Sequence, residues 1–476
     1  MSEASTPMEK TERNAFLRVM GAMTLLLLTT STMNSTVFPL FDEVFTYARD
    51  ISVFANAAAL VAVGLVAAFS PARLNGRVLV RATAGLFAFG LVALPAALAL
   101  ANPVLLVIAS CVFAMARGWT MVCVGLAASL LSARNLTFAV VVSFALECAI
   151  DLVLWFAPGV CGVIVFLLGA PLALALAWTS ARGVLERAAA GEPPIDVAIT
   201  QPSSFLPLAG TFFVCLFLFR VAFGYSLRFF EEAGAPLPGF VGVVPVVIVA
   251  AIALALSRGR FLADLATQVS VLFVVAGFFL AATMGRGSAG VAVALLSAGN
   301  TLFDMVAWGV IISVASRNVY GSVATIAWGR GVSSLGTIAG AALGVWSTAA
   351  FGQDGRIEVL VAGVLILVFV GYALIGLKNF SFAEVIQGVV PVVEEPEVKT
   401  PEEEFEERCA ELSERYGLSP REREVFVMLA RGRNREYIQE QLVVSRNTVK
   451  AHVKHVYAKL DIHTHQELID LVESGE

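Results

Sequence analysis

Residues 418–472 read LSPREREVFVMLARGRNREYIQEQLVVSRNTVKAHVKHVYAKLDIHTHQELIDLV, and this stretch decides the fold of the end of the chain. Four of its apolar residues recur at i, i+4, i+7 and i+11, namely Val449, Val453, Val456 and Leu460. This spacing places them on one face of an α-helix. The pattern therefore predicts a helix that buries one side.

The opposite side of this helix carries charge and little bulk, in Asn447, Lys450, Ala451 and Lys454. Such a face suits the major groove of DNA, where amide, ammonium and small apolar groups meet base edges. Residues 418–464 hold nine Lys or Arg against five Asp or Glu, so the block is locally basic, as phosphate binding requires. A solvated helix face is the alternative interpretation of the lysines.

Capping residues divide the stretch into four short helices. Ser419 and Glu422 have the spacing of a capping box with Pro420 between them, and they open a helix that continues through Ala430. A second helix is expected from about residue 434 to 442, a third after Ser445, and a last one from 464 to about 473.

Four helices in this order, carrying SRNTVKAHVKHVYAKL, resemble the LuxR-type helix-turn-helix domain. The resemblance implies that Lys450, Ala451 and Lys454 face base edges. It also implies that phosphates are contacted by Thr448, His452, Arg433 and Arg435, and we add Asn447 and Arg446 to the expected DNA-binding set. In this family the last helix often makes a homodimer contact, here through Leu468, Ile469, Leu471 and Val472.

The rest of the chain is too apolar for a soluble protein. Of 476 residues, 58% are hydrophobic and only 14% are charged, which predicts many membrane spans. Twelve spans are expected to begin near Phe16, Ile51, Val78, Val104, Ala139, Gly159, Leu206, Phe240, Leu265, Val291, Ser322 and Ile357. The fold class is therefore all-α, with a twelve-helix transmembrane bundle in front of the four-helix domain.

Basic residues cluster after every second span and before the first, whereas the alternate loops carry only isolated cations such as Arg49. By the positive-inside rule both termini then face the cytoplasm, as expected of a multi-pass protein of the bacterial cytoplasmic membrane. The expected divisions are an N-terminal tail (1–15), a first half (16–182), a cytoplasmic loop (183–205), a second half (206–378), an acidic linker (379–416) and the DNA-binding domain (417–476).

An internal repeat is predicted at an offset of 183 residues, because Gly76-Arg77 matches Gly259-Arg260 and Arg134-Asn135 matches Arg317-Asn318. Two six-helix halves joined by a polar loop resemble the major facilitator superfamily. That family carries an Asp-Arg…Gly-Arg pattern after its second span. Ala72 stands here where the Asp is expected, which weakens the case for active transport.

Charged and polar residues inside spans are candidates for function, because burying them in a bilayer is costly. The candidates for a ligand site or gate are Glu147, Asp151, Arg330, Arg117, Asp304, Arg220, Asn34, Trp308 and Trp328. A structural alternative is that Glu147–Arg330 and Arg117–Asp304 are buried pairs that lock the halves together. A proton relay is a third possibility, and the two tryptophans either pack or stack on a flat ligand.

The segment after Asn379 changes to an acidic, proline-containing composition that predicts a tether. Beyond Pro401, four residues recur at helical spacing before Gly417, namely Phe405, Cys409, Leu412 and Tyr416. This short amphipathic helix is expected to pack on the DNA-binding domain or on its copy in a partner. Its acidic residues form a solvated face or compete with DNA for the basic surface.

The whole chain resembles membrane-anchored LuxR-type regulators of the gut actinobacterial kind. This resemblance implies a one-component transcription regulator that senses an unidentified small molecule, lies in a lipid bilayer and binds double-stranded DNA as a homodimer. The alternative is a major-facilitator-type transporter with a regulatory DNA-binding tail. No cofactor, metal site or catalytic constellation is expected from the residues, so we do not expect an enzyme.

Overall fold

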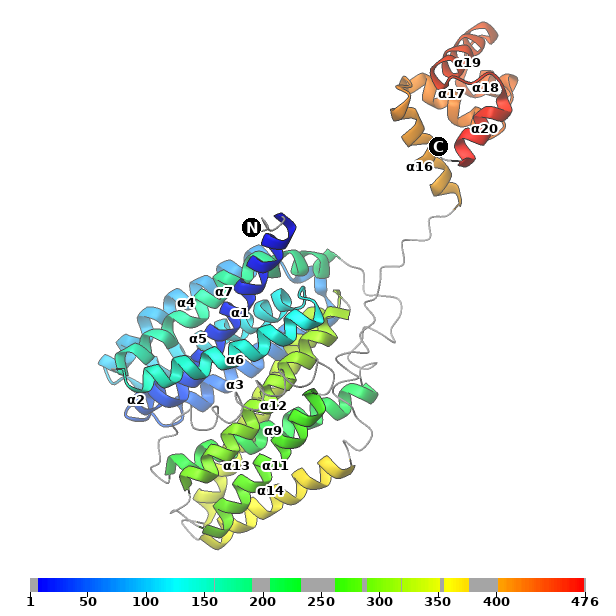
Figure 1. Ribbon diagram of the computed structural model, residues 1–476. Helices are drawn as coiled ribbons and strands as arrows, with labels where there is room; N and C mark the ends of the chain where they lie inside the picture. Colours follow the sequence, from blue (N-terminus) through cyan, green and yellow to red (C-terminus); the bar gives the residue numbers. More distant parts are fainter. Residues whose placement is uncertain are drawn as a thin grey trace, which may run out of the picture. The chain divides into compact units, whose positions relative to one another are not determined.

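The computed structural model describes residues 7–157, 159–190, 206–232, 262–284, 289–317, 319–351, 355–375 and 401–474. All regular secondary structure in these ranges is helical (Figure 1). The chain divides into two compact units, Met1–Pro391 and Val392–Glu476, each with its own hydrophobic core.

The first half of the membrane unit follows the predicted order of spans. Its helices are α1 (Pro7–Thr32), a π-helix (Met33–Val37), α2 (Phe38–Asp42), α3 (Ala48–Phe69), a 3-10 turn (Pro71–Arg73), α4 (Gly76–Ala99), α5 (Pro103–Ala128), α6 (Ala133–Trp155) and α7 (Gly159–Ala190). Side-chain caps explain several starts. Asn75 accepts the backbone N–H groups of Arg77 and Val78 at the start of α4, and Asn102 accepts that of Leu105 at the start of α5.

The second half is described for α9 (Leu206–Glu232), α11 (Leu262–Met284), α12 (Ala289–Arg317), α13 (Ser322–Phe351) and α14 (Gly355–Ile375). Eleven of the twelve predicted spans thus coincide with described helices, and the span near Phe240 lies outside the described residues. Within the described residues, eight helices are long and apolar enough to cross a membrane, by length and composition.

Some predicted boundaries were wrong. Helix α6 starts at Ala133, six residues before the predicted Ala139, because Ser132 caps it by accepting the N–H of Asn135. Helix α7 continues to Ala190, past the predicted end at residue 182. The pair between Arg182 and Glu186 (2.7 Å) supports this extension, since i, i+4 ion pairs stabilise exposed helix turns.

The predicted position of Arg49 also needs a correction, because this residue does not lie in a loop. It lies in the first turn of α3 with only 3% of its surface exposed. Its guanidinium stacks over the Phe38 ring at 3.9 Å and lies 3.5 Å from Asp50. A buried arginine carries no information about the sidedness of a loop, so Arg49 does not bear on orientation.

Helices α9 and α13 pack backbone to backbone through glycines. A Cβ atom on Gly224 would lie 2.0 Å from the carbonyl oxygen of Thr337, and one on Gly340 would lie 2.1 Å from that of Val221. Gly336 and Gly340 are four residues apart, the small-xxx-small spacing that lets membrane helices approach closely. The glycines of α13 therefore serve close helix packing.

The two halves meet where α13 packs on α3, as Figure 1 lets the reader follow. Trp328 of α13 lies against Gly64 of α3, where an added Cβ would be 3.2 Å from the indole ring. Asn56 of α3 donates from Nδ2 to the hydroxyl of Ser334 on α13 at 3.0 Å. Trp328 therefore packs at this interface, in agreement with the packing alternative for that residue.

The C-terminal unit contains α16 (Pro401–Arg415), α17 (Pro420–Ala430), α18 (Arg435–Leu442), α19 (Arg446–Leu460) and α20 (His465–Ser474). The last four match the predicted helices closely. Helix α16 packs on α17 and α20 through Cys409 and Leu412, so the expected amphipathic helix belongs to the core of this unit. Its end at Gly417, with a φ of +61°, agrees with a left-handed glycine cap.

The close α9–α13 contact makes a testable prediction. Gly340→Ala should lower the melting temperature of the purified full-length protein in detergent, because the new methyl group must push two helix backbones apart, at a cost of about 1–3 kcal/mol. The matched control is Gly363→Ala on α14, where an added Cβ meets nothing within 4 Å. The control should melt at or slightly above the wild-type temperature, since alanine favours helix. Equal melting temperatures for the two variants would contradict the packing argument.

Candidate DNA-binding surface and membrane cavity

The predicted buried face of α19 is the centre of the C-terminal core. Val449, Val453, Val456 and Leu460 are each at most 4% exposed. The side chain of Ser445 accepts the backbone N–H of Thr448 at 3.2 Å and so begins the helix. One face of α19 is thereby fixed toward the core, and the other face is left toward solvent.

Most of the predicted DNA-binding residues lie on the surface of this unit. Six of them are exposed, namely Asn447, Lys450, Ala451, Lys454, Arg433 and Arg435. The side chain of Arg446 is 83% exposed, with Glu436 4.0 Å away. His452 and Thr448 are half-buried, and the Thr448 hydroxyl is hydrogen bonded to that of Ser445 at 2.8 Å. Thr448 thus has a capping role in addition to the phosphate contact expected of it.

The segment between α18 and α19 is held in an unusual conformation. Val443 has a φ of +51° and its side chain is 88% exposed. A β-branched residue with positive φ is strained, so the surrounding contacts must hold the turn. One such contact is the guanidinium of Arg421, which donates to the carbonyl oxygen of Leu442 at 2.9 Å and so fixes the end of α18.

Glu422 ties the start of α17 to the end of α19. Its carboxylate accepts the backbone N–H of Ser419 at 2.8 Å and the ammonium of Lys459 at 2.7 Å. Lys459 also donates to the carbonyl oxygen of Gly417 at 2.8 Å. The hydrogen bond from Lys459 and that from Ser419 lower the pKa of Glu422 from its ordinary value of 4.5 to about 2. This predicted capping box therefore also orients α19.

The predicted dimer contact needs a correction. Leu468 and Val472 are 0% and 3% exposed because they pack inside the C-terminal core. They cannot meet a partner without opening that core. Ile469 and Leu471 are half-buried and remain available on α20 for a contact between copies.

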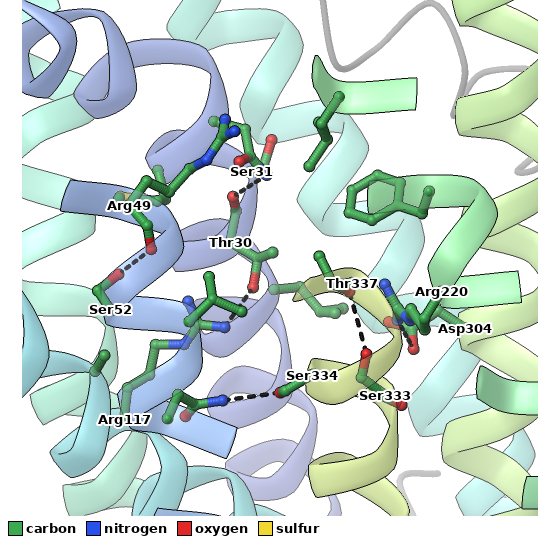
Figure 2. Close-up of a pocket in the computed structure, with 18 of the residues that line it drawn as sticks. Thr30, Ser31, Arg49, Ser52, Arg117, Arg220, Asp304, Ser333, Ser334 and Thr337 are labelled. Carbon is green, nitrogen blue, oxygen red and sulfur yellow. Dashed lines mark hydrogen bonds and ion pairs between the residues drawn. The ribbon is translucent and has the colours of Figure 1, made fainter. Parts of the chain in front are cut away.

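The membrane unit contains a cavity of about 260 Å³ between its halves (Figure 2). Of the nine predicted ligand or gate residues, seven line it, namely Glu147, Arg330, Arg117, Asp304, Arg220, Asn34 and Trp308. Asp151 and Trp328 do not line it. Asp151 accepts the hydroxyl of Ser31 instead, and Trp328 packs on α3 as described above.

The charged pairs differ from those that the sequence suggested. Asp304 of α12 is shared by two arginines, Arg220 of α9 and Arg330 of α13, the second at 2.9 Å. Arg117 donates to the hydroxyl of Thr30 at 3.2 Å. Within the described residues neither Glu147–Arg330 nor Arg117–Asp304 forms a pair, so the expectation that these pairs lock the halves together is wrong. Asp304 connects three helices of the second half.

Other polar and charged residues of the cavity were missed by sequence reasoning, among them Arg49, Asp50, Ser52, Asn56, Asn300, Ser333 and Ser334. Small polar residues are common at helix contacts in membranes, so their types alone gave no signal. The π-helix Met33–Val37 also contributes to the wall, through Met33, Asn34 and Ser35. Breaks of this kind inside helices often occur at functional sites.

Residues 417–472 match the family model described as bacterial regulatory proteins, luxR family. The C-terminal domain is a LuxR-type helix-turn-helix domain. A curated relative, the Fimbriae Z protein of Salmonella typhimurium, is 42% identical over 59 residues, which are 12% of this chain. The matched region spans 28% of the length of that relative, so the similarity covers only a small part of each chain.

Solved transporter structures resemble the membrane unit in fold. The human organic anion transporter MFSD10 (TETRAN) is similar with a TM-score of 0.52 at 14% identity, over 77% of this chain and 100% of that chain. A bacterial homologue of the iron transporter ferroportin gives a TM-score of 0.50 at 13% identity, over 76% and 99%. The membrane unit therefore has a fold like that of major facilitator transporters. At these identities the likeness concerns the fold alone.

The Glu422 contacts predict how the stability of the C-terminal unit depends on pH. A folded-state pKa below the ordinary value means that the folded state favours the ionised carboxylate. Its contribution is present above about pH 4.5 and is lost as the pH falls toward about 2. Thermal unfolding of a fragment of residues 401–476 should show this loss, and Glu422→Gln should melt lower at pH 7 and lose stability less steeply on acidification.

The matched control for this experiment is Glu424→Gln on the same helix, whose carboxylate is 50% exposed in its pair with Arg421. Exposed pairs contribute about 0–1 kcal/mol, so this variant should follow the wild-type pH profile. An unchanged acid profile in Glu422→Gln would show that Glu422 does not anchor α17 to α19.

Proposed function

We propose that this protein is a one-component transmembrane transcription regulator. In this proposal the membrane unit binds a small molecule, and the LuxR-type domain binds operator DNA as a homodimer. The observation that carries the proposal is the exposed face of α19, with Lys450, Ala451 and Lys454 presented to solvent while the opposite face forms the core. A helix fixed in this way can enter a major groove without rearrangement of the domain.

The membrane cavity supports the sensing part of the proposal. Its wall combines charged side chains from both halves with apolar ones, which is the composition of small-molecule sites. Because the cavity lies between the halves, a ligand that fits one arrangement of the halves better than another shifts the balance between them. The distribution of basic residues along the sequence supports a cytoplasmic position for both termini, which is the side on which DNA lies.

The alternative function is a transporter of the major facilitator type with a regulatory DNA-binding tail. The fold of the membrane unit and its central cavity favour this candidate. Against it stands Ala72, at the position where the family pattern has an Asp. We therefore place the sensor first and the transporter second.

DNA binding tests the first candidate directly. The full-length protein in lipid nanodiscs should enrich a two-fold symmetric sequence from a random duplex pool, with half-sites about one helical turn apart. Lys450→Ala with Lys454→Ala should abolish this enrichment, since a good base contact contributes about 1–3 kcal/mol of discrimination. Binding should also weaken steeply with salt, because phosphate contacts release counterions.

The control variant for DNA binding is Arg415→Ala, which removes an exposed cation from α16 and leaves the face of α19 intact. It should enrich the same sequence as the wild type. If the double lysine variant also enriched that sequence, the assignment of α19 as the DNA-reading helix would be refuted.

Flux measurements separate the two candidates. In proteoliposomes a sensor binds its ligand without net uptake or efflux, whereas a transporter moves it. Transport would depend on the buried cavity charges, so Glu147→Gln or Arg330→Gln would stop it. Flux that both substitutions abolish would establish the transporter and displace the sensor.

A further inference from the structure

The charges that the described residues bring to the cavity do not balance. Among these residues four arginines line it, namely Arg49, Arg117, Arg220 and Arg330, against three carboxylates, namely Asp50, Glu147 and Asp304. Arginine stays protonated in proteins, so the sum is positive whether or not Glu147 carries a proton. One carboxylate, that of Asp304, serves both Arg220 and Arg330. The cavity therefore has an excess of cationic groups.

Arg117 and Arg330 contribute to this excess. Their guanidinium groups, from α5 and α13, line the same cavity. The hydrogen bond of Arg117 goes to a neutral hydroxyl, that of Thr30. Figure 2 shows Arg117 on one side of the cavity and the Arg220–Asp304 pair on the other. Two like charges in a region of low dielectric require an anion to offset their repulsion.

Several buried donors at this place lack an acceptor among the described residues. They are Nε of Arg117, Nε of Arg330 and the indole Nε1 of Trp308, and all three residues line the cavity. Trp308 and Arg330 are only 1% and 5% exposed. A buried donor without a partner is destabilising by about 1–3 kcal/mol, so three such donors on cavity-lining residues favour a ligand that supplies an acceptor.

The apolar residues of the cavity wall and the cavity volume indicate the polarity and size of the ligand. Five phenylalanines line the cavity, namely Phe41, Phe113, Phe144, Phe166 and Phe223. The guanidinium of Arg330 lies 4.3 Å from the centre of the Trp308 ring, which holds it in position. The volume of about 260 Å³ lies just below the range of about 300–1,000 Å³ for drug-sized ligands, so the ligand is small.

We propose that the cavity binds a small organic carboxylate, whose carboxylate group is held between Arg117 and Arg330 and whose apolar body lies against the phenylalanines. Arginine suits this task because its planar fork matches a carboxylate with two hydrogen bonds. Asp304 holds Arg220 and Arg330 in place and leaves a net positive charge for the ligand. This proposal rests on the sensing role proposed for the membrane unit, and it names the chemical class that is sensed.

The competing ligand class is a cation bound at Glu147. This side chain is 8% exposed and has no hydrogen bond or ion pair with a described residue. Asp151 lies one turn further along α6, and Asp304 lines the same cavity. An amine would therefore find attraction at Glu147, but it would also meet the cavity arginines Arg117, Arg220 and Arg330. The test below includes amines for this reason.

The experiment measures thermal stabilisation of the full-length protein in detergent at constant ionic strength and pH 7. The probes are benzoate and hexanoate, the neutral amides benzamide and hexanamide, and the cations benzylamine and hexylamine. Both carboxylates should raise the melting temperature in a saturable manner, because a ligand that binds only the folded state stabilises it. The amides and amines should have no effect at the same concentrations.

Substitutions of Arg117 test whether the carboxylates bind in the cavity. Arg117→Met should weaken carboxylate binding at least tenfold, and Arg117→Lys should fall between it and the wild type, because it keeps the charge and loses the fork. The control is Arg182→Met, which removes an exposed arginine of α7 outside the cavity and should bind like the wild type. Arg117→Lys also guards against the possibility that Arg117→Met fails to fold.

Three results would overturn the proposal, namely stabilisation by the amines alone, stabilisation by no probe, or equal carboxylate binding in both Arg117 variants and the wild type. The DNA enrichment experiment tests the proposed function separately. Carboxylate binding without DNA enrichment would support the proposed ligand class and refute the proposed regulator. DNA enrichment without carboxylate binding would support the regulator and refute the ligand class.

Discussion

The buried carboxylate of Asp304 is the interaction on which the membrane unit depends most. It lies on α12 and meets arginines of both α9 and α13, so one anionic group connects three helices. In the interior of a membrane protein an arginine without a carboxylate or a comparable acceptor is strongly unfavourable. These three helices therefore have to stay together, and together they form one wall of the cavity. Their close approach is possible because glycines replace side chains between α9 and α13.

Local patterns in the sequence predicted the helices of the C-terminal unit almost completely. The spacing of Val449, Val453, Val456 and Leu460 fixed which face of α19 is buried, and therefore which face carries Lys450 and Lys454. Short-range caps such as Ser419 with Glu422 fixed where the helices start. What local patterns could not provide is the contact between Glu422 and Lys459, because that ion pair joins residues 37 positions apart.

The membrane site was predicted by residue type but not by pairing. Charges inside apolar spans are conspicuous, which is why seven of nine candidates line the cavity. Their partners depend on how helices rotate and cross, and the pairs suggested for Glu147 and Arg117 were therefore wrong. Arg49 was missed for a related reason. It lies at the edge of an apolar run, and the sequence does not tell whether such a residue faces water or turns inward beneath Phe38.

Helix α13 links binding in the cavity to the arrangement of the halves. One face of α13 contacts the backbone of α9 at Gly336 and Gly340. Another face contributes Arg330, Ser333 and Ser334 to the lining of the cavity. Ser334 also accepts a hydrogen bond from Asn56 of the first half. A ligand that draws Arg330 toward Arg117 therefore acts on α9 and α13 as one body against α3. To invert a balance of 1:99 it must prefer one arrangement by about 5.5 kcal/mol. A charge-assisted hydrogen bond contributes about 1.5–3 kcal/mol, so about two to four such bonds, made in one arrangement and absent in the other, are sufficient.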